Sequence, residues 1–300
     1  MATGAVALPQ MQKPVIPLHT LNHMTLHVSD VQRSLEFYQG LFGLPVQARQ
    51  GPTVVLRIGE GPQFVALAGT SAAVRPSIGH FCATTAPFVL SQILDQLAAH
   101  GIMRSENSAP LSVRVRIRRE KDGGSPEGTP EVYVSDPDGS VVQLQHTSYC
   151  GGPGALGEGC SSVVENAPRL GLMPLVDYRG FTLRVKDERR TRQFYESIFA
   201  LAPLRPGSSM YRIGPGKQTI SIVQSAGDVA AQPVIWNVSL LAKPMKVAAM
   251  EAALRRFGCK RQAGITPNLP PLSYALSEDG GQSGVDLADP DGVLLRLRSA

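Results

Sequence analysis

Residues 21–30 read LNHMTLHVSD, and residues 31–43 continue VQRSLEFYQGLFG. In the first segment apolar and polar side chains alternate, which is the period of a β-strand with one apolar and one polar face. In the second segment the apolar residues follow the spacing of a helix, with an aspartate suited to its N-cap and a glycine suited to its end. The sequence therefore predicts a strand followed by a helix. Because the helix can cover only the apolar face of the strand, we expect His23 and His27, on the polar face, to point into a cavity.

The same unit returns later in the chain. Asp187 stands 157 residues after Asp30, and a second Phe-Tyr pair, at 194–195, stands 157 residues after the first. The run DPDG also occurs twice, at residues 136–139 and 289–292, each time before an apolar stretch. A duplication with matching signatures at both ends of each copy indicates two homologous domains. We therefore expect an N-terminal arm, a first domain, a Gly- and Pro-rich linker and a second domain, at residues 1–20, 21–147, 148–176 and 177–300.

Each domain is expected to contain two shorter modules of one strand, one helix and three further strands. In the first domain the second module begins near His80 and contains an amphipathic helix over residues 88–100. In the second domain the modules begin near residues 179 and 233. Periodicity and turn residues predict the remaining strands of the first domain at residues 47–49, 54–58, 64–68, 112–119, 131–135 and 141–146.

Composition describes an ordinary globular chain. Of the 300 residues, 43% are hydrophobic and 18% are charged, and the net charge is +5. The basic residues are dispersed and aromatic residues make up only 6% of the chain, which argues against a nucleic-acid partner. No apolar run is long enough to span a membrane, and the first residues lack the features of a signal peptide. We expect a cytoplasmic protein, with a periplasmic location as the alternative if a signal peptide has been removed.

These motifs together resemble the vicinal oxygen chelate superfamily. The shared features are the His23 strand with its helix, the His80 strand and the DPDG turn before a last strand. The superfamily includes glyoxalase I, fosfomycin- and bleomycin-resistance proteins, methylmalonyl-CoA epimerase and the extradiol ring-cleaving dioxygenases. The resemblance is strong over residues 21–147 and weaker over 178–298. It implies an α+β fold of tandem domains, in which the two βαβββ modules of each domain form a half-open barrel around a divalent metal ion.

The resemblance also implies a set of metal ligands. His23 and His80 match the two histidine positions of the superfamily, and Gln143 occupies the third position, which is usually a glutamate. An amide offers an oxygen but carries no charge and cannot act as a general base. A fourth ligand, as in glyoxalase I, would fall near Ala66, which cannot bind a metal. One side of the ion would therefore remain open to substrate or O₂, and Fe(II) is the first choice, with Mn, Zn or Co as alternatives.

Other residues of the first domain are candidates for catalysis or substrate binding. With no carboxylate at position 143, His27 is the acid–base candidate, and Tyr133 is either a hydrogen-bonding acid or a core residue. Cys82, Gln145 and Arg116 are expected to line the substrate cavity. For the strand face shared by Arg114, Arg116 and Arg118, contact with solvent is favoured over a clamp for an acidic substrate.

The second domain lacks the corresponding donors. Gly180, Asn237 and Arg296 stand at the positions of His23, His80 and Gln143. We therefore expect a structural partner domain. In two-domain extradiol dioxygenases the metal-bearing domain is usually the C-terminal one, so the order would be inverted here.

Three functions are compatible with the sequence. The leading hypothesis is a metal-dependent dioxygenase acting on a small aromatic or vicinal-oxygen substrate. The alternatives are a metal-dependent isomerase, lyase or transferase of the glyoxalase type, and a metal-free small-molecule binding protein similar to the bleomycin-resistance proteins. A monomer and a homodimer are both open, as is the choice between a disulfide and free thiols for Cys150 and Cys160.

Overall fold

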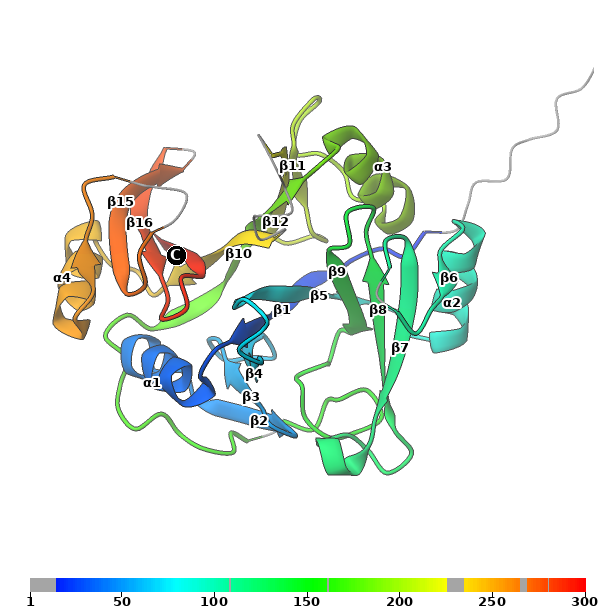
Figure 1. Ribbon diagram of the computed structural model, residues 1–300, viewed down its shortest axis with the longest axis horizontal. Coiled ribbons are helices and arrows are strands. Elements are labelled where there is room, and N and C mark those ends of the chain that lie inside the picture. Colours follow the sequence, from blue (N-terminus) through cyan, green and yellow to red (C-terminus); the bar gives the residue numbers. More distant parts are fainter. Residues whose placement is uncertain (1–14, 108, 161, 226–234, 265–268, 280) are drawn as a thin grey trace, which may run out of the picture.

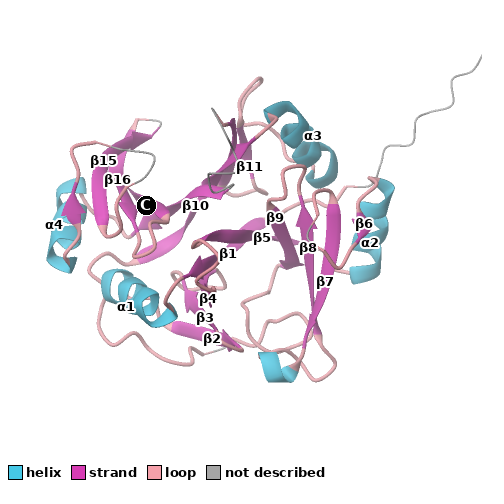
Figure 2. Ribbon diagram, in the orientation of Figure 1, coloured by secondary structure: helices cyan, strands magenta, loops and turns pink. Residues whose placement is uncertain are grey.

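Two mixed β-sheets organise the molecule, one in each domain (Figure 1). The structure is a computed structural model, and it describes residues 15–107, 109–160, 162–225, 235–264, 269–279 and 281–300. Residues 1–14 of the expected N-terminal arm lie outside this set. Helices α2 and α4 lie at opposite outer margins of the molecule (Figure 2). The α+β class and the tandem arrangement agree with the expectation from sequence.

The first domain contains a nine-stranded sheet in the order β2-β3-β4-β1-β5-β9-β8-β7-β6. Strand β1 pairs in parallel with β4 and antiparallel with β5, and β5 pairs in parallel with β9. The first strands of both modules and the last strand of the second module are therefore neighbours. The elements are β1 Thr20–Val28, α1 Val31–Phe42, β2 Val46–Gln50, β3 Thr53–Arg57, β4 Phe64–Gly69, β5 Ser77–Thr85, α2 Leu90–Ala99, β6 Met103–Arg104, β7 Ser112–Arg118, a 3₁₀ turn Glu120–Asp122, β8 Thr129–Ser135 and β9 Val141–His146.

The predicted strand–helix unit is present at β1 and α1. The side chain of Asp30 accepts a hydrogen bond from the backbone N–H of Arg33 at 3.0 Å, so it caps the helix. Gly43 ends the helix with φ of +72°, a left-handed conformation that glycine adopts without strain. The apolar face of β1 is fully buried in the core with the helix residues Phe37 and Tyr38. The polar side chains of β1, which include His23 and His27, therefore lie on the face of the sheet opposite to α1.

The second domain repeats this plan with an eight-stranded sheet in the order β11-β12-β10-β13-β17-β16-β15-β14. Among the described residues, its first module has two strands after the helix in place of three. The elements are β10 Leu175–Val185, α3 Glu188–Phe199, β11 Met210–Arg212, β12 Thr219–Gln224, β13 Ile235–Ala242, α4 Val247–Phe257, β14 Lys260–Arg261, β15 Ser273–Asp279, β16 Gln282–Ala288 and β17 Leu294–Ser299.

The sequence motifs that reveal the duplication also join the two domains. The hydroxyl of Tyr38 in α1 donates to Asp289 Oδ2 at 3.1 Å, and the hydroxyl of Tyr195 in α3 donates to Asp136 Oδ2 at 3.3 Å. The helix of each domain therefore contacts the DPDG turn of the other domain. We call this reciprocal pair of contacts the Tyr–Asp latch.

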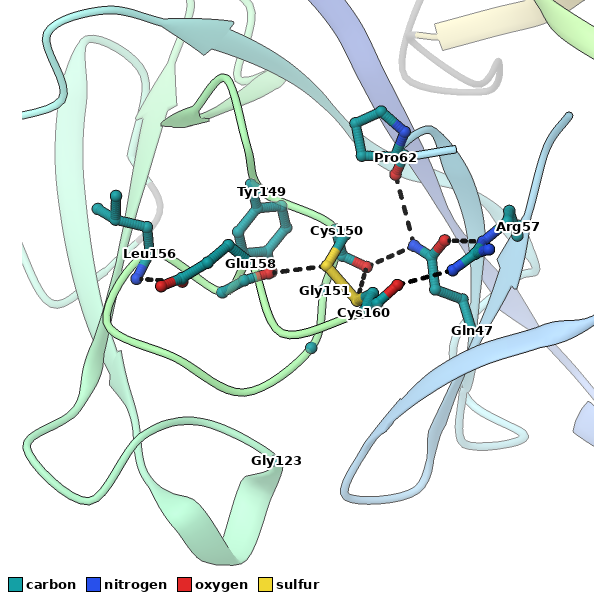
Figure 3. Close-up of a disulfide and its surroundings, with 12 residues drawn as sticks. Gln47, Arg57, Pro62, Gly123, Tyr149, Cys150, Gly151, Leu156, Glu158 and Cys160 are labelled. Atoms are coloured by element: carbon teal, nitrogen blue, oxygen red, sulfur yellow. Dashed lines mark hydrogen bonds between the residues drawn. A yellow bond between two sulfur atoms is a disulfide. The ribbon is translucent and has the colours of Figure 1, made fainter. Parts of the chain in front are cut away.

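The segment predicted as a linker folds against the first domain. Its first part, residues 149–160, is closed by a disulfide between Cys150 and Cys160 (Figure 3). We call residues 149–160 the strap. Beyond the strap, Glu165 pairs with Val46 at the start of β2, and the second domain begins with β10. Among the described residues, no helix combines the length and the apolarity needed to cross a bilayer.

Candidate functional site

Three neighbouring strands bring the predicted metal ligands together. His23 in β1, Cys82 in β5 and Gln143 in β9 are partners in the strand register, so their side chains share one face of the sheet. The Oε1 atom of Gln143 lies 3.1 Å from His23 Nε2 and 3.0 Å from His80 Nε2. His23 and Gln143 are each 2% exposed, whereas His80 is partly exposed. We call His23, His80 and Gln143 the triad.

The ring of His23 is held in one orientation by its neighbours. Its Nδ1 atom lies 2.9 Å from Asn22 Oδ1, and the Asn22 amide nitrogen donates to the backbone carbonyl of Tyr149 at 2.8 Å. Because that bond fixes the amide, its oxygen faces the ring, and Nδ1 carries the proton that is donated to it. The ring also stacks on Phe64, with centroids 4.1 Å apart. The lone pair of Nε2 therefore points toward Gln143.

Both imidazoles of the triad are neutral near pH 7. Burial, followed by the charge of His80, lowers the pKa of His23 well below its ordinary value of 6.5. Burial lowers the pKa of His80 to about 4. The hydroxyl of Thr25 lies 3.1 Å from His80 Nε2 and adds a polar neighbour on the partly exposed side of the triad.

The geometry of the triad fits a divalent metal ion. With bonds of about 2.1 Å, adjacent donor atoms around an octahedral ion are roughly 3.0 Å apart, close to the two distances from Gln143 Oε1. The unprotonated nitrogen of His23 also faces an oxygen, and a cation between these two acceptors would satisfy both. The reversed amide, with its NH₂ toward the two rings, would satisfy them without a metal. Among the described residues, no group of three or more His, Cys, Asp or Glu side chains is placed to hold a metal, so Gln143 would have to serve as a ligand.

His27 lies beside the triad on the same strand face. Its ring occupies the space above Gly79, where an added Cβ would lie 2.5 Å from the His27 ring. Its charge also lowers the pKa of His80, and its own pKa is lowered by burial. The structure therefore places the predicted acid–base residue next to a predicted ligand.

A buried carboxylate that the sequence analysis did not identify lies near the triad. Glu131 in β8 is 1% exposed. It accepts hydrogen bonds from Arg118 Nε at 2.9 Å, from the Tyr149 hydroxyl at 3.1 Å and from the Tyr133 hydroxyl at 2.8 Å. The ring of Tyr133 in turn meets the His80 ring edge-on, at 5.4 Å between centroids. The polar alternation along β8 could have indicated that Glu131 and Tyr133 share a face.

The prediction of a solvated arginine face on β7 is wrong for Arg118. Its side chain is fully buried, because the pairing with Glu131 compensates the charge. The apolar neighbour Ile117 is 41% exposed instead. Arg116, predicted to bind substrate, has a side chain that is 42% exposed and lies 3.6 Å from Glu131. Arg116 is therefore placed at the edge of the Glu131 network.

The remaining predicted cavity residues lie beside the triad in the sheet. Cys82 is fully buried, and burial raises the pKa of its thiol well above the usual value, so the thiol stays protonated. Gln145 follows Gln143 on the same face of β9 and is also fully buried. Neither atom of its amide has a hydrogen-bond partner among the described residues.

The strap covers the side of the sheet at Ala66, from which a fourth ligand would come, and Figure 3 shows its disulfide beside Gln47 and Arg57. The Gln47 amide donates to the Cys150 carbonyl at 2.6 Å, and Arg57 donates to the Cys160 carbonyl at 3.0 Å. Tyr149 packs into an apolar cluster with Ala48, Val55, Phe64 and Ala66. That side of the triad is therefore filled by buried side chains, and the partly exposed side lies at His80 and His27.

Comparisons with known proteins agree with this architecture. Residues 20–144 match the model of the Glyoxalase/Bleomycin resistance protein/Dioxygenase superfamily. No curated protein matches the chain.

Solved structures with a similar fold include the 2,3-dioxygenase LapB from Pseudomonas sp. KL28, with a TM-score of 0.65, 13% identity and coverage of 96% of this chain and 94% of that chain. Another is homoprotocatechuate 2,3-dioxygenase from Arthrobacter globiformis, with a TM-score of 0.61 and 15% identity. The match covers 96% of this chain and 81% of that chain. At these identities the similarity concerns the fold. The first domain, which contains the matched residues 20–144, therefore belongs to this superfamily, and the whole chain shares the tandem two-domain fold of these dioxygenases.

Proposed function

We propose that the first domain binds a divalent metal ion through His23, His80 and Gln143 and acts as a dioxygenase on a small substrate with vicinal oxygens. The observation on which this rests is the convergence of three donor atoms from three neighbouring strands, with separations of 3.0 and 3.1 Å. The 2,3-dioxygenases of similar fold support the choice of reaction class. Fe(II) is the proposed metal, with Mn, Zn or Co as alternatives.

The charge of the triad indicates which substrates would bind. All three donors are neutral, so a bound ion would keep its full charge of +2, unlike an ion held by two histidines and a carboxylate. An anionic chelating substrate, such as an aromatic diol that has lost a proton, would compensate that charge. When bound, the ion would supply Lewis acidity and open coordination positions for the substrate oxygens and O₂.

The residues around the triad would then divide the remaining tasks. His27 would take a proton from an incoming hydroxyl group, a role supported by its partial exposure next to His80. Burial raises the pKa of Tyr133, so its hydroxyl keeps the proton that it donates to Glu131, and its ring forms part of the wall beside His80. The strap would shield the closed side from solvent, because its Tyr149 packs against Phe64 and Ala66 there. The Cys150–Cys160 disulfide supports the exported alternative for location, because disulfides persist in oxidising compartments.

A metal-free binding function is the second candidate. It is favoured by the same two contacts of the Gln143 amide, because an amide turned by 180° would place its NH₂ group where it could donate to both imidazoles. In that arrangement the triad would be a hydrogen-bonding wall of a ligand cavity.

Metal content separates the two functions. We would measure it in protein purified anaerobically without a histidine tag, for wild type, His23→Ala and His80→Ala. His146→Ala, which alters a histidine at the end of β9, is the matched control. Near-stoichiometric Fe, Mn, Zn or Co in wild type and in the control, with loss in the two triad variants, would support the metal site. A wild type that contains no metal and takes up none would contradict it.

Oxygen uptake separates the reaction classes. Metal-loaded protein that consumes O₂ with catechol-type substrates would be a dioxygenase. Metal-loaded protein that converts vicinal-oxygen substrates without O₂ uptake would be an isomerase, lyase or transferase.

A further inference from the structure

The second domain carries a cationic cluster at the place that corresponds to the triad. Arg296 in β17 stands at the position of Gln143, and Asn237 in β13 stands at the position of His80. Asn237 pairs in register with Thr182 of β10 and with Leu294 of β17. Because paired residues share a sheet face and alternate residues of one strand do too, Asn237 and Arg296 lie on the same face. The two first-domain ligands have therefore been replaced by an amide and a guanidinium group.

Arg184 and Arg298 lie close to Arg296, and the buried carboxylate of Asp286 contacts both Arg296 and Arg298. Asp286 in β16 is fully buried and lies 3.2 Å from Arg296 Nε and 3.4 Å from an Arg298 nitrogen. Asp286 also accepts a hydrogen bond from the Ser277 hydroxyl at 2.6 Å. The charge of Asp286 therefore compensates one of the two guanidinium groups that contact it. The side chain of Arg296 is 21% exposed, so its outer part can be reached from solvent.

The single tryptophan of the chain, Trp236, lies beside two of these arginines. Trp236 stands where the first domain has Gly79, the glycine that makes room for His27. The guanidinium carbon of Arg184, at the position of His27, lies 3.5 Å from the centre of the Trp236 ring, and that of Arg296 lies 5.2 Å from it. Two guanidinium groups thus lie beside one aromatic ring, and burial, followed by the charge of Arg296, lowers the pKa of Arg184.

Unpartnered polar atoms lie in the same place. Asn237 is fully buried, and neither atom of its amide has a hydrogen-bond partner among the described residues. The indole N–H of Trp236 is buried without a partner in the same part of the structure. Leaving a buried polar group unpaired costs about 1–3 kcal/mol, and buried polar groups in folded proteins are rarely left so. Two unpartnered donor groups beside the partly exposed guanidinium group of Arg296 are suited to binding an oxyanion.

We propose that this face of the second domain binds a small oxyanion, namely a carboxylate or phosphate group of a small molecule. The Arg296 guanidinium group and the Asn237 amide nitrogen are its hydrogen-bond donors, and Arg184 adds positive potential. The site is separate from the triad and does not depend on metal binding in the first domain.

Trp236 provides a direct probe of this site because the chain contains no other tryptophan. We would titrate the full chain with sodium phosphate, sodium acetate and sodium benzoate at constant ionic strength and follow Trp236 fluorescence, with calorimetry as a second readout. A saturable change with at least one of these anions is expected. Saturation with phosphate alone or with carboxylates alone identifies the group that is recognised.

Three variants test the assignment. Asn237→Leu removes the buried amide at similar volume and should raise the titration midpoint by about tenfold or more, the equivalent of one lost hydrogen bond. Arg296→Lys keeps the charge but loses the planar donor pair, so it should also weaken binding. Arg212→Gln removes an exposed charge from the same domain and should leave the midpoint within about twofold.

Two results would overturn the proposal. One is the absence of saturable binding in both readouts for wild type, which would leave the Asn237 amide to an ordered water. The other is an unchanged midpoint in both Asn237→Leu and Arg296→Lys. Asn237→Leu removes an unpaired buried amide, so we expect it to fold at least as stably as wild type, and unfolding in urea checks this.

Discussion

Gln143 differs in charge from the carboxylate that is usual at its position in the superfamily. Gln143→Glu should therefore bind a divalent metal at least about tenfold more tightly, because a carboxylate adds one negative charge at nearly the same place. Gln143→Leu should lose the metal. Anaerobic calorimetric titration with Mn(II) or Fe(II) measures both effects. Gln145→Leu, two residues further along the same face, is the control, and equal affinities for wild type and Gln143→Glu would contradict a metal-binding triad.

Asn22 acts on the triad through His23. Asn22→Leu removes the acceptor for the Nδ1 proton, so the His23 tautomer is no longer fixed, and metal affinity should fall by about tenfold or more. Nitrogen-15 NMR of the imidazoles reports the tautomer independently of metal binding. An Asn22→Leu protein that keeps both the wild-type tautomer and the wild-type affinity would show that Asn22 has no orienting role.

The metal-ligand set could be proposed from sequence, whereas its surroundings could not. His23 and His80 each begin a module, so their positions follow from local periodicity. Glu131 and Arg118 are buried only because β7 and β8 pair so that the two charges meet, and single-strand periodicity treats both as surface residues. The side chain of Asn22 contacts the ring of His23. This contact could not be predicted, because the alternation of a strand places neighbouring residues on opposite faces.

Among the elements, the strap departs most from its sequence-based interpretation. Its glycines suggest a flexible linker, but several of them allow close approach of chain segments. At Gly151, φ is +81° and an added Cβ would lie 3.2 Å from the Phe64 ring. Composition cannot distinguish a glycine needed for packing from one needed for flexibility. The helices and long strands were predicted well, because their periodicity and caps are local signals.

The strap should contribute to stability through its disulfide. The bridge spans a sequence separation of 10 residues, and closing a loop of this size stabilises a protein by about 2–3 kcal/mol. Reductant should therefore lower the free energy of unfolding of wild type by about this amount, as measured in urea. The double variant Cys150→Ser/Cys160→Ser should start from the lower value and show no response to reductant. A wild type that is equally insensitive would show that the bridge does not stabilise the fold.

At the scale of the whole molecule, the Tyr–Asp latch explains why the two domains retain matching motifs although only one retains the triad. Asp136 and Asp289 are buried at the domain interface, each accepting backbone N–H bonds within its own turn and a tyrosine hydroxyl from the other domain. The contacts of the latch involve no triad residue, so they do not depend on which residues stand at the triad positions of either domain.

The latch should make the stability of the whole molecule depend on pH. Burial raises the pKa of Asp136 and of Asp289 from 3.8 to about 6. A carboxyl group with a higher pKa in the folded state binds its proton more readily there than in the unfolded chain. The contribution of these two groups to the free energy of unfolding should therefore fall as pH rises from about 4 to about 6, and stay low above that range. Each carboxyl group is expected to contribute on the order of 2 to 3 kcal/mol to this change.

Urea unfolding of variants as a function of pH isolates the latch from other titrating groups. Asp136→Asn/Asp289→Asn should show a flatter pH dependence than wild type over this range. Tyr38→Phe and Tyr195→Phe should each destabilise by about 1–3 kcal/mol, and more above pH 6, because each leaves an ionised buried carboxylate short of one donor. Tyr274→Phe, which alters a buried tyrosine within the second domain, should show no such pH dependence. Identical pH profiles for wild type and the double Asn variant would mean that these carboxyl groups titrate alike in the folded and unfolded chains. Apolar contacts between the domains, such as that of Phe81 with Phe181, would then be the better explanation of how the domains are held together.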